Sequence, residues 1–404
     1  MAIPNLAFIS LVLTMTTVHG QTVERVDPVK RAVSAHHGVV RYQQGEFTAW
    51  PANNGLWTWD GGQEILVGFT YGRYVEQEGH KIAEPRNGLA RSTDSGETWS
   101  AFFPENYADD RLPITNLTEP MDFEAPDFAL RVCGMGYHGN AIDEPCFYYS
   151  YDRGATWNGP FRFAGMENMN ELEGITHITP RTDYRVLGSN SCQVFASATG
   201  GPFEDKTFVM ETGDGGLSFS FVSWVVPPTD PYRAVMPQTV AVGDETLVSV
   251  MRRRDKPGTR TECWLDAYAS SDGGRSWSFL SKVAYTGFGD SNGNPPAMTR
   301  LEDGRLSVAY GNRSLRMLMC RLSEDNGKTW GDEIILRDDL RYDGRFADFG
   351  YPRVMQRPDG KILVCYYFSD DEHPEQYIAS TIFTLDEFED AEIERSMVLP
   401  PEHE

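Results

Sequence analysis

Short apolar segments alternate with turn residues along most of the chain, and this pattern predicts an all-β protein. One unit recurs: an approach containing proline, an apolar strand, a Gly-Asp or Asp-Gly turn and a second apolar strand, written most clearly in residues 294–310 and 351–366. The recurrence predicts six four-stranded sheets, which we place near residues 46–105, 124–165, 172–224, 232–285, 292–340 and 348–385.

A second pattern ends five of these six units. The motif S/T-x-D-x-G-x-S/T-W/F occurs at residues 92–99, 150–157, 212–219, 270–277 and 323–330, and its central aspartates are 53 to 62 residues apart. The aspartate can accept hydrogen bonds from nearby amides, the glycine supplies a positive φ, and the final aromatic ring packs on its own sheet. Because the motif recurs in every repeat but one, we interpret these aspartates as structural and not catalytic.

The sixth unit lacks this motif, which bears on how the array closes. A repeat of one sheet per 53 to 62 residues is typical of a β-propeller. Pairing of an N-terminal strand with the last sheet would remove that sheet's exposed edge. We therefore predict a six-bladed β-propeller in which residues near 38–42 complete the last blade.

The first twenty residues differ from the rest of the chain. Residues 1–20 contain no Asp, Glu, Lys or Arg, an apolar run covers residues 6–13, and small residues precede Gln21. This pattern predicts a signal peptide at 1–20, a single propeller domain at 21–404, and export to an extracellular or periplasmic location. A retained membrane anchor is the alternative, but the run is shorter than the roughly 20 residues that a spanning helix needs.

The cysteines and the net charge limit which covalent links, metals and ligands we expect for this chain. Cys133 and Cys146 bracket one hairpin loop and are the best candidates for a disulfide in an exported protein, whereas no C-x-x-C spacing indicates a zinc site. The formal net charge of −23 argues against nucleic acid. An anionic small substrate requires arginines that converge locally. We expect no metal, no cofactor, no membrane span and no obligate protein partner.

Five such motifs, often called Asp boxes, in a six-bladed propeller resemble the sialidase superfamily. That resemblance implies an arginine triad that binds the substrate carboxylate, a tyrosine nucleophile activated by a glutamate, and an aspartate acid/base. Arg252, in V-S-V-M-R, is similar to the second arginine, and Arg313, in Y-G-N-R, to the third. Tyr351, in F-G-Y-P, is placed like the nucleophile, and Arg73, in Y-G-R, like an auxiliary arginine.

Three family positions differ here. Thr48 stands where the first arginine is expected, and Met236 stands near the expected glutamate. No aspartate occurs in residues 74–80, so Glu78 or His80 is the candidate proton donor.

Polar residues at the expected mouth, including Asn54, Asp290 and Asp348, suit sugar hydroxyls. The leading hypothesis is a secreted glycoside hydrolase acting on a terminal acidic or decorated sugar of a glycan. Two alternatives stay open: a lyase that acts on uronate polysaccharides with a tyrosine and histidine pair, and a glycan-binding propeller without catalysis.

Overall fold

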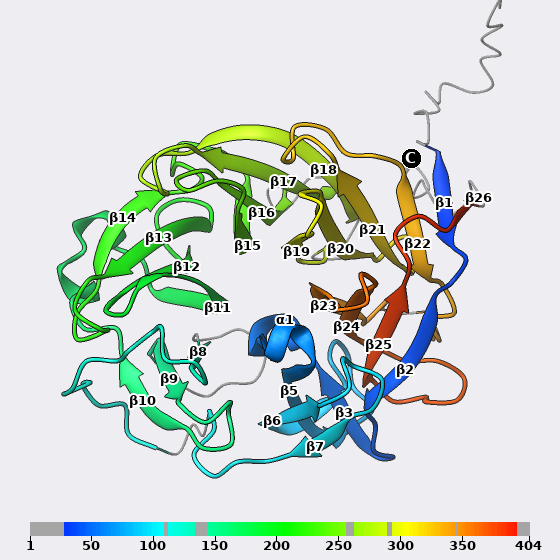
Figure 1. Cartoon of the computed structure of the whole chain (residues 1–404), viewed down its shortest axis with the longest axis horizontal. Helices are drawn as coiled ribbons and strands as arrows, with labels where there is room; N and C mark the ends of the chain where they lie inside the picture. Colours follow the sequence, from blue (N-terminus) through cyan, green and yellow to red (C-terminus); the bar gives the residue numbers. More distant parts are fainter. Residues whose placement is uncertain are drawn as a thin grey trace, which may run out of the picture.

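Six β-sheets form a ring around a central axis in the computed structural model (Figure 1). The structure describes residues 28–108, 112–133, 144–255, 262–288, 293–344 and 346–393. The six-bladed propeller predicted from the sequence is confirmed. The predicted signal peptide lies outside the described residues.

The first three blades follow one another in chain order. Blade one contains β3 (Glu46–Ala49), β5 (Glu64–Tyr74), β6 (Ile82–Ser92) and β7 (Ser100–Phe102), with β4 (Leu56–Trp59) also paired to β5. Blade two contains β8 (Ala129–Cys133), β9 (Cys146–Ser150) and β10 (Asn158–Arg162). Blade three contains β11 (His177–Gly188), β12 (Ser191–Thr199), β13 (Lys206–Thr212) and β14 (Ser220–Trp224).

The remaining blades include both ends of the described chain. Blade four contains β15 (Arg233–Ala241), β16 (Leu247–Arg254), β17 (Glu262–Ser270) and β18 (Ser278–Phe288). Blade five contains β19 (Ala297–Arg300), β20 (Leu306–Asn312), β21 (Met317–Ser323), β22 (Glu333–Arg337), β1 (Val29–Ala32) and β26 (Phe388–Ala391). Blade six contains β23 (Gly350–Gln356), β24 (Ile362–Phe368), β25 (Tyr377–Phe383) and β2 (His36–Arg41).

An N-terminal strand closes the ring, as predicted. Strand β2 pairs antiparallel with β25, with Gly38 opposite Ser380. The sequence did not predict the second closure, in which β1 pairs parallel with β22 and β26 pairs antiparallel with β1. Both additions cover strand edges that would otherwise be exposed. Blades one, two and five do not have the predicted four strands. Five, three and six strands are described in them, respectively.

The five box motifs have the same internal hydrogen bonds. In the second copy, Asp152 Oδ1 accepts the backbone N–H of Thr156 at 2.8 Å, and Asp152 Oδ2 accepts the Thr156 hydroxyl at 2.6 Å. The Ser150 hydroxyl donates to Asp152 and accepts the N–H of Gly154. The other four copies repeat these contacts between hydroxyl, carboxylate and amide. These hydrogen bonds support the structural role assigned to the aspartates.

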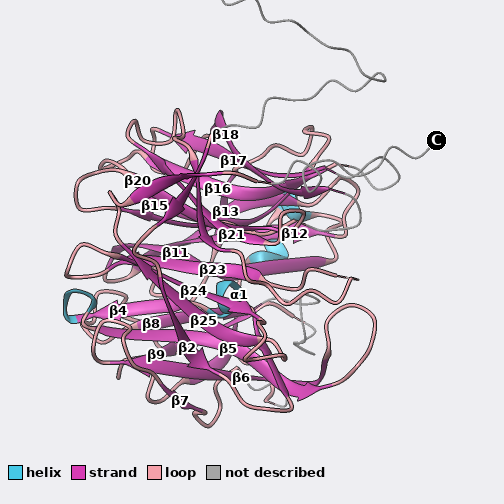
Figure 2. Cartoon of the chain, turned by 90° about the vertical axis from the view of Figure 1, so that its right-hand side faces the viewer, coloured by secondary structure: helices cyan, strands magenta, loops and turns pink. Residues whose placement is uncertain are grey.

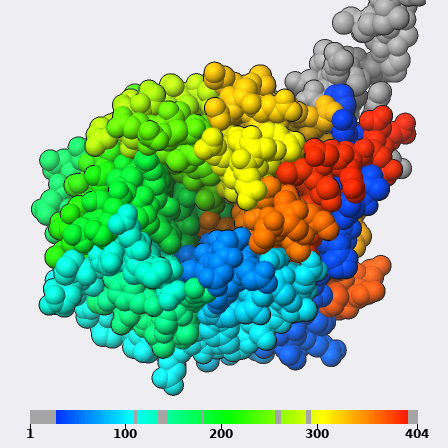
Figure 3. Space-filling model, viewed as in Figure 1, coloured from blue at the N-terminus to red at the C-terminus, as the bar shows by residue number. Residues whose placement is uncertain are grey.

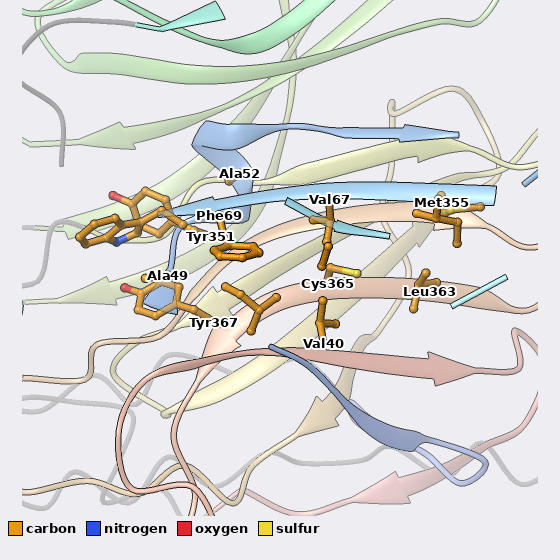
Figure 4. Packing of buried hydrophobic residues seen from close by; sticks show 14 of the residues in the cluster. Val40, Ala49, Ala52, Val67, Phe69, Tyr351, Met355, Leu363, Cys365 and Tyr367 are labelled. Atoms are coloured by element: carbon orange, nitrogen blue, oxygen red, sulfur yellow. The ribbon is translucent and has the colours of Figure 1, made fainter. Parts of the chain in front are cut away.

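Apolar side chains fill the spaces between neighbouring blades. One cluster lies between blades one and six and includes Phe69, Tyr351 and Tyr367 (Figure 4). Met236 of blade four also belongs to this cluster. Figure 2 shows strands as the bulk of the molecule, with only short helical pieces. These pieces are α1 (Pro51–Asn54) and the 3₁₀ turns Asp60–Gly62, Met166–Asn168 and Asn170–Leu172. Within the described residues, no helix combines the length and apolar character needed to cross a membrane.

Helix α1 lies at the centre of the ring (Figure 1). Trp50, which precedes it, has φ 59°, and Pro51 begins the helix. Asn54 is fully buried: its Nδ2 donates to the carbonyl of Trp50, and its Oδ1 accepts Arg131 Nη2 at 2.9 Å. Carbonyl groups of this one helical turn are thereby presented to arginines of the inner strands.

The cysteines of the described residues are all buried thiols. Cys133 and Cys146 are direct partners across β8 and β9, but the predicted disulfide is not formed in this structure. A hydrogen bond from the neighbouring thiol of Cys146 lowers the pKa of Cys133 below its ordinary value. Their placement is compatible with oxidation of the pair.

Candidate functional site

The backbone at the start of β23 places Tyr351 beside the central axis. Gly350 has φ 100° and Tyr351 has φ 48°, a conformation that non-glycine residues seldom adopt. Asn294 holds it: Nδ2 donates to the carbonyl of Phe349, and Oδ1 accepts the N–H of Tyr351, both at 2.8 Å. A Cβ on Gly350 would lie 2.4 Å from the Asn294 amide, so this position requires glycine.

Two predicted arginines converge on this tyrosine. Arg252 Nη1 donates to Tyr351 Oη at 3.2 Å, and both side chains are almost fully buried. The Arg313 guanidinium lies 5.9 Å from the centre of the Tyr351 ring and 4.8 Å from that of Phe346. Arg252 comes from β16 of blade four, and Arg313 follows β20 of blade five. Residues of three successive blades therefore meet at one point.

A second tyrosine connects this centre to a histidine and carboxylate pair. Tyr367 donates its hydroxyl proton to Asp348 at 2.5 Å and accepts a hydrogen bond from Arg313 at 3.2 Å. His80 Nδ1 lies 2.9 Å from the same carboxylate. Burial, followed by the charge of Asp348, raises the pKa of Tyr367 well above its ordinary value. Tyr367 is therefore a neutral hydrogen-bond donor, and Asp348 orients the imidazole of His80.

Arg181, which was not among the predicted site residues, is a third buried arginine near Tyr351. It comes from β11, interacts electrostatically with Tyr351 and Arg252, and donates to the carbonyls of Ala52 and Met236 at 3.2 and 3.1 Å. Met236, which stands near the glutamate position that the resemblance implies, contributes its backbone oxygen to this contact. Arg181 supplies a guanidinium to a centre whose first inner strand has Thr48 instead of an arginine.

One signal for Arg181 was present in the sequence. Inner strands β11, β15 and β23 each contain a register shift, and a proline falls at each one: Pro180, Pro237 and Pro352. Proline cannot donate to the ladder, so within a sheet it is confined to edge strands such as these three and to bulges. The residue beside each proline is Arg181, Met236 or Tyr351.

A network of hydrogen-bonded polar side chains lies next to this centre. Arg353 donates to Gln238 Oε1 at 2.7 Å and to the carbonyl of Ala52 at 2.6 Å. The amide group of Gln238 in turn donates to Asp183 at 3.0 Å. Burial raises the pKa of Asp183 to about 7 and lowers that of Arg353 to about 10. These residues tie helix α1 to blades three, four and six.

The centre holds positive charge in a strongly acidic protein. Arg181 and Arg353 are buried and donate mainly to carbonyl and amide oxygens. Burial, followed by the charge of Arg353, lowers the pKa of Arg181 well below its ordinary value, and Arg181 Nη2 has no hydrogen-bond partner among the described residues. Because a guanidinium stays protonated in proteins, an anion beside Arg181 would relieve this cost.

The centre borders a cavity of about 1050 Å³ between the loops of blades one, five and six. His80, Asp348 and Phe346 form the part of its wall that contacts the tyrosine and arginine centre. On the face of the ring that Figure 3 shows, the surface is hollowed near the central axis, but the figure does not identify the lining residues of this cavity. No group of three or more His, Cys, Asp or Glu side chains is placed to hold a metal ion in the described part of the chain.

The structure separates the other predicted site residues. Glu78 is an exposed residue of the cavity wall. Arg73 is largely exposed and paired with Glu84 at 3.6 Å, and it does not line this cavity. Asn54 is a buried anchor of helix α1. Asp290 lies outside the described residues.

Comparisons with known proteins agree with this architecture. A crystal structure of a protein of unknown function from Dyadobacter fermentans has a TM-score of 0.64 at 18% identity, with 88% of this chain and 99% of that chain covered. An α-L-arabinofuranosidase of Fusarium graminearum in complex with arabinobiose has a TM-score of 0.57 at 12% identity, with 88% and 99% covered. A sialidase of Streptococcus pneumoniae has a TM-score of 0.51 at 11% identity, with 87% and 71% covered.

These identities are low, so the structural matches establish a shared fold alone. Among curated protein sequences, none matches this chain. The BNR repeat-like domain model matches residues 147–364, which is more than half of the chain. The protein therefore belongs to the family of BNR repeat-like domains.

Proposed function

We propose that this protein is an exported glycoside hydrolase that removes a terminal sugar carrying an acidic group from a glycan. The observation that carries the proposal is the contact between Arg252 and Tyr351 inside a centre of buried arginines. Guanidinium groups bind carboxylates through charge-assisted hydrogen bonds. The arabinofuranosidase and the sialidase that share this fold support a reaction on carbohydrate.

In the proposed reaction, Arg252, Arg313 and Arg181 bind the acidic group. The phenol of Tyr351 loses its proton to solvent as its oxygen attacks the anomeric carbon, the bond from that carbon to the leaving oxygen breaks, and protonated His80 gives the leaving oxygen a proton. Water then attacks the anomeric carbon of the glycosyl-tyrosine, the bond from that carbon to the tyrosine oxygen breaks, His80 takes a proton from the water, and the tyrosine oxygen regains a proton from solvent. A neutral phenol suits an anomeric centre near a carboxylate, because a carboxylate nucleophile would be repelled.

His80 fits the proton-transfer role better than Glu78. Asp348 holds Nδ1 of His80 at 2.9 Å, so Nε2 is the ring nitrogen that would exchange a proton with the substrate. The ring is enclosed by Trp50, 4.9 Å away, and by Phe346, 5.8 Å away. Glu78 is exposed on the loop that precedes it.

A screen with product analysis tests this proposal. Purified protein would be incubated with sialosides, uronides, arabinosides and uronate polysaccharides, and products separated by mass spectrometry. The proposal expects a released acidic monosaccharide and a new reducing end without near-ultraviolet absorbance. An unsaturated absorbing product would establish the lyase alternative, and binding without any product would establish a glycan-binding propeller.

A further inference from the structure

The cavity beside the centre of Tyr351 and the arginines differs from that centre in size and in charge. Three loops form it: residues 74–81 of blade one, residues 341–344 and 346–348 before blade six, and residues 369–376 within blade six. Its volume of about 1050 Å³ is at the upper end of the range for small-molecule sites, and it extends well beyond the wall formed by His80 and Asp348. A single terminal sugar held by the arginines would leave most of this space for the group attached to it.

Carboxylates dominate the charge of this cavity. The described lining residues with ionised side chains are Glu76, Glu78, Asp343, Asp348 and Glu375, against the cations Lys81 and Arg341. Lys81 is already paired, because its Nζ lies 3.0 Å from Asp343 and 3.3 Å from Glu76. Burial opposes ionisation of Glu375, but hydrogen bonds from the Tyr42 hydroxyl and the Gly45 N–H lower its pKa below the ordinary value, and Arg341 adds a smaller electrostatic contribution. Lys81 is thus compensated by its two carboxylates, whereas Glu78 has no ion-pair partner in the described part of the chain.

The remaining lining groups are neutral. Gln77, Gln376 and Ser369 supply amides and a hydroxyl, and Tyr74, Phe346 and Pro374 supply apolar surface. Amides and hydroxyls donate and accept hydrogen bonds as sugar hydroxyls do, and ring faces pack against sugar carbons. This wall therefore suits uncharged sugars. A carboxylate placed here would face several fixed negative charges within about one Debye length.

We propose that this cavity is the subsite for the leaving group and that it selects an uncharged sugar next to the terminal acidic one. The inference rests on the proposed function, because it takes the bond to be cleaved as lying between the arginine centre and the cavity. The two regions have opposite charge: buried arginines at the centre and carboxylates at the cavity wall. A glycan with one acidic end fits both regions. A continuous polyanion, such as a polyuronate, fits only the first.

The test compares two pairs of substrates at low ionic strength. In each pair the terminal acidic sugar is the same and the neighbouring sugar is neutral or acidic: sialyl-lactose against disialic acid, and galacturonosyl-galactose against digalacturonic acid. We expect kcat/KM to favour the neutral neighbour by about 10-fold or more, and added salt to reduce this preference. Glu78→Lys should lower the preference at least about 3-fold. Glu119→Lys, the same charge change at an exposed site away from the cavity, should leave it unaltered.

Binding supplies a readout that does not depend on turnover. Lactose and digalacturonic acid would be titrated against the tryptophan fluorescence of the wild type and of Glu78→Lys, because Trp50 lies beside His80. Binding of lactose in preference to digalacturonic acid, reduced by Glu78→Lys, supports the subsite even if no substrate is hydrolysed and the proposed function fails. Hydrolysis with equal kcat/KM for both neighbours overturns the subsite and leaves the proposed function standing. If the protein shows neither binding nor hydrolysis, both the subsite and the proposed function are overturned.

Discussion

Arg252 Nη1 lies 3.2 Å from the hydroxyl oxygen of Tyr351, although 99 residues separate the two in the chain. The contact joins β16 of blade four to β23 of blade six. Arg313, from the blade between them, lies beside the Tyr351 ring. The propeller thus gathers at its axis groups that successive repeats supply one at a time.

Loss of Arg181 should reduce activity without reducing stability. Arg181→Met removes a buried guanidinium whose pKa is held well below its ordinary value, so the melting temperature should stay level or rise. The value of kcat/KM for the acidic substrate should fall by about 10²-fold or more, since the variant cannot bind the anionic group. Arg131→Met is the matched control and should lower the melting temperature, because Arg131 donates to four oxygens around helix α1. A destabilised Arg181→Met variant would contradict this account of the centre.

A role of His80 in proton donation predicts dependence on the leaving group. His80→Gln should reduce kcat by about 10²-fold or more on natural glycans and much less on aryl glycosides, whose leaving group needs no proton. Glu78→Gln should show no such difference between the two kinds of substrate. If the leaving-group dependence appears in Glu78→Gln and not in His80→Gln, the assignment of the proton donor is wrong.

The box aspartates should affect stability and not turnover. Asp152→Ala deletes hydrogen bonds to the amide and hydroxyl of Thr156, and should cost roughly 1 to 2 kcal/mol and a few degrees in melting temperature. Asp244→Ala, at an exposed carboxylate outside the boxes, serves as the control. Loss of activity in a fully stable Asp152→Ala protein would show that a catalytic group had been taken for a structural one.

Acid should destabilise the propeller through the same aspartates. Hydrogen bonds from Ser276 and its neighbours lower the pKa of Asp272 to about 2, and the pKa of Asp94, Asp152, Asp214 and Asp325 is also lowered. A lowered folded-state pKa stabilises the fold above the unfolded value near 3.8, and that contribution is lost as the pH falls toward 2. Melting temperatures between pH 5 and pH 2 should therefore decline less steeply in Asp272→Asn than in the wild type. Parallel curves for the two proteins would refute the assignment.

The sequence predicted the fold and part of the centre. The repeat of box motifs fixes the number of sheets, and the missing sixth box indicates where the ring closes. Arg252 and Arg313 could be placed with Tyr351 because the two arginines lie where the second strands of neighbouring blades end, and Tyr351 lies where the inner strand of the next blade begins. The strand pair β1 and β26 could not be predicted, since neither end of the chain carries the repeat pattern.

Other parts of the centre depend on contacts that no local pattern encodes. Asp348 was expected to bind substrate, but its contacts with His80 and Tyr367 depend on how two loops and β24 meet. Arg181 was missed because the family's arginine was sought on the first inner strand, whereas a bulge in the third blade supplies it. Arg73 was placed by its neighbours in the sequence, yet it lies at a strand end that faces solvent.

The central claim is that the Tyr351 hydroxyl reacts while the arginines around it hold the acidic group. The most direct measurement is the turnover of Tyr351→Phe on a substrate identified by the screen, with Tyr310→Phe as control because it deletes another buried hydroxyl that binds a carboxylate, Glu333. We predict that Tyr351→Phe keeps its melting temperature within about 2 °C and loses about 10²-fold or more in kcat, whereas Tyr310→Phe keeps its kcat. Wild-type turnover by a folded Tyr351→Phe protein would contradict the account.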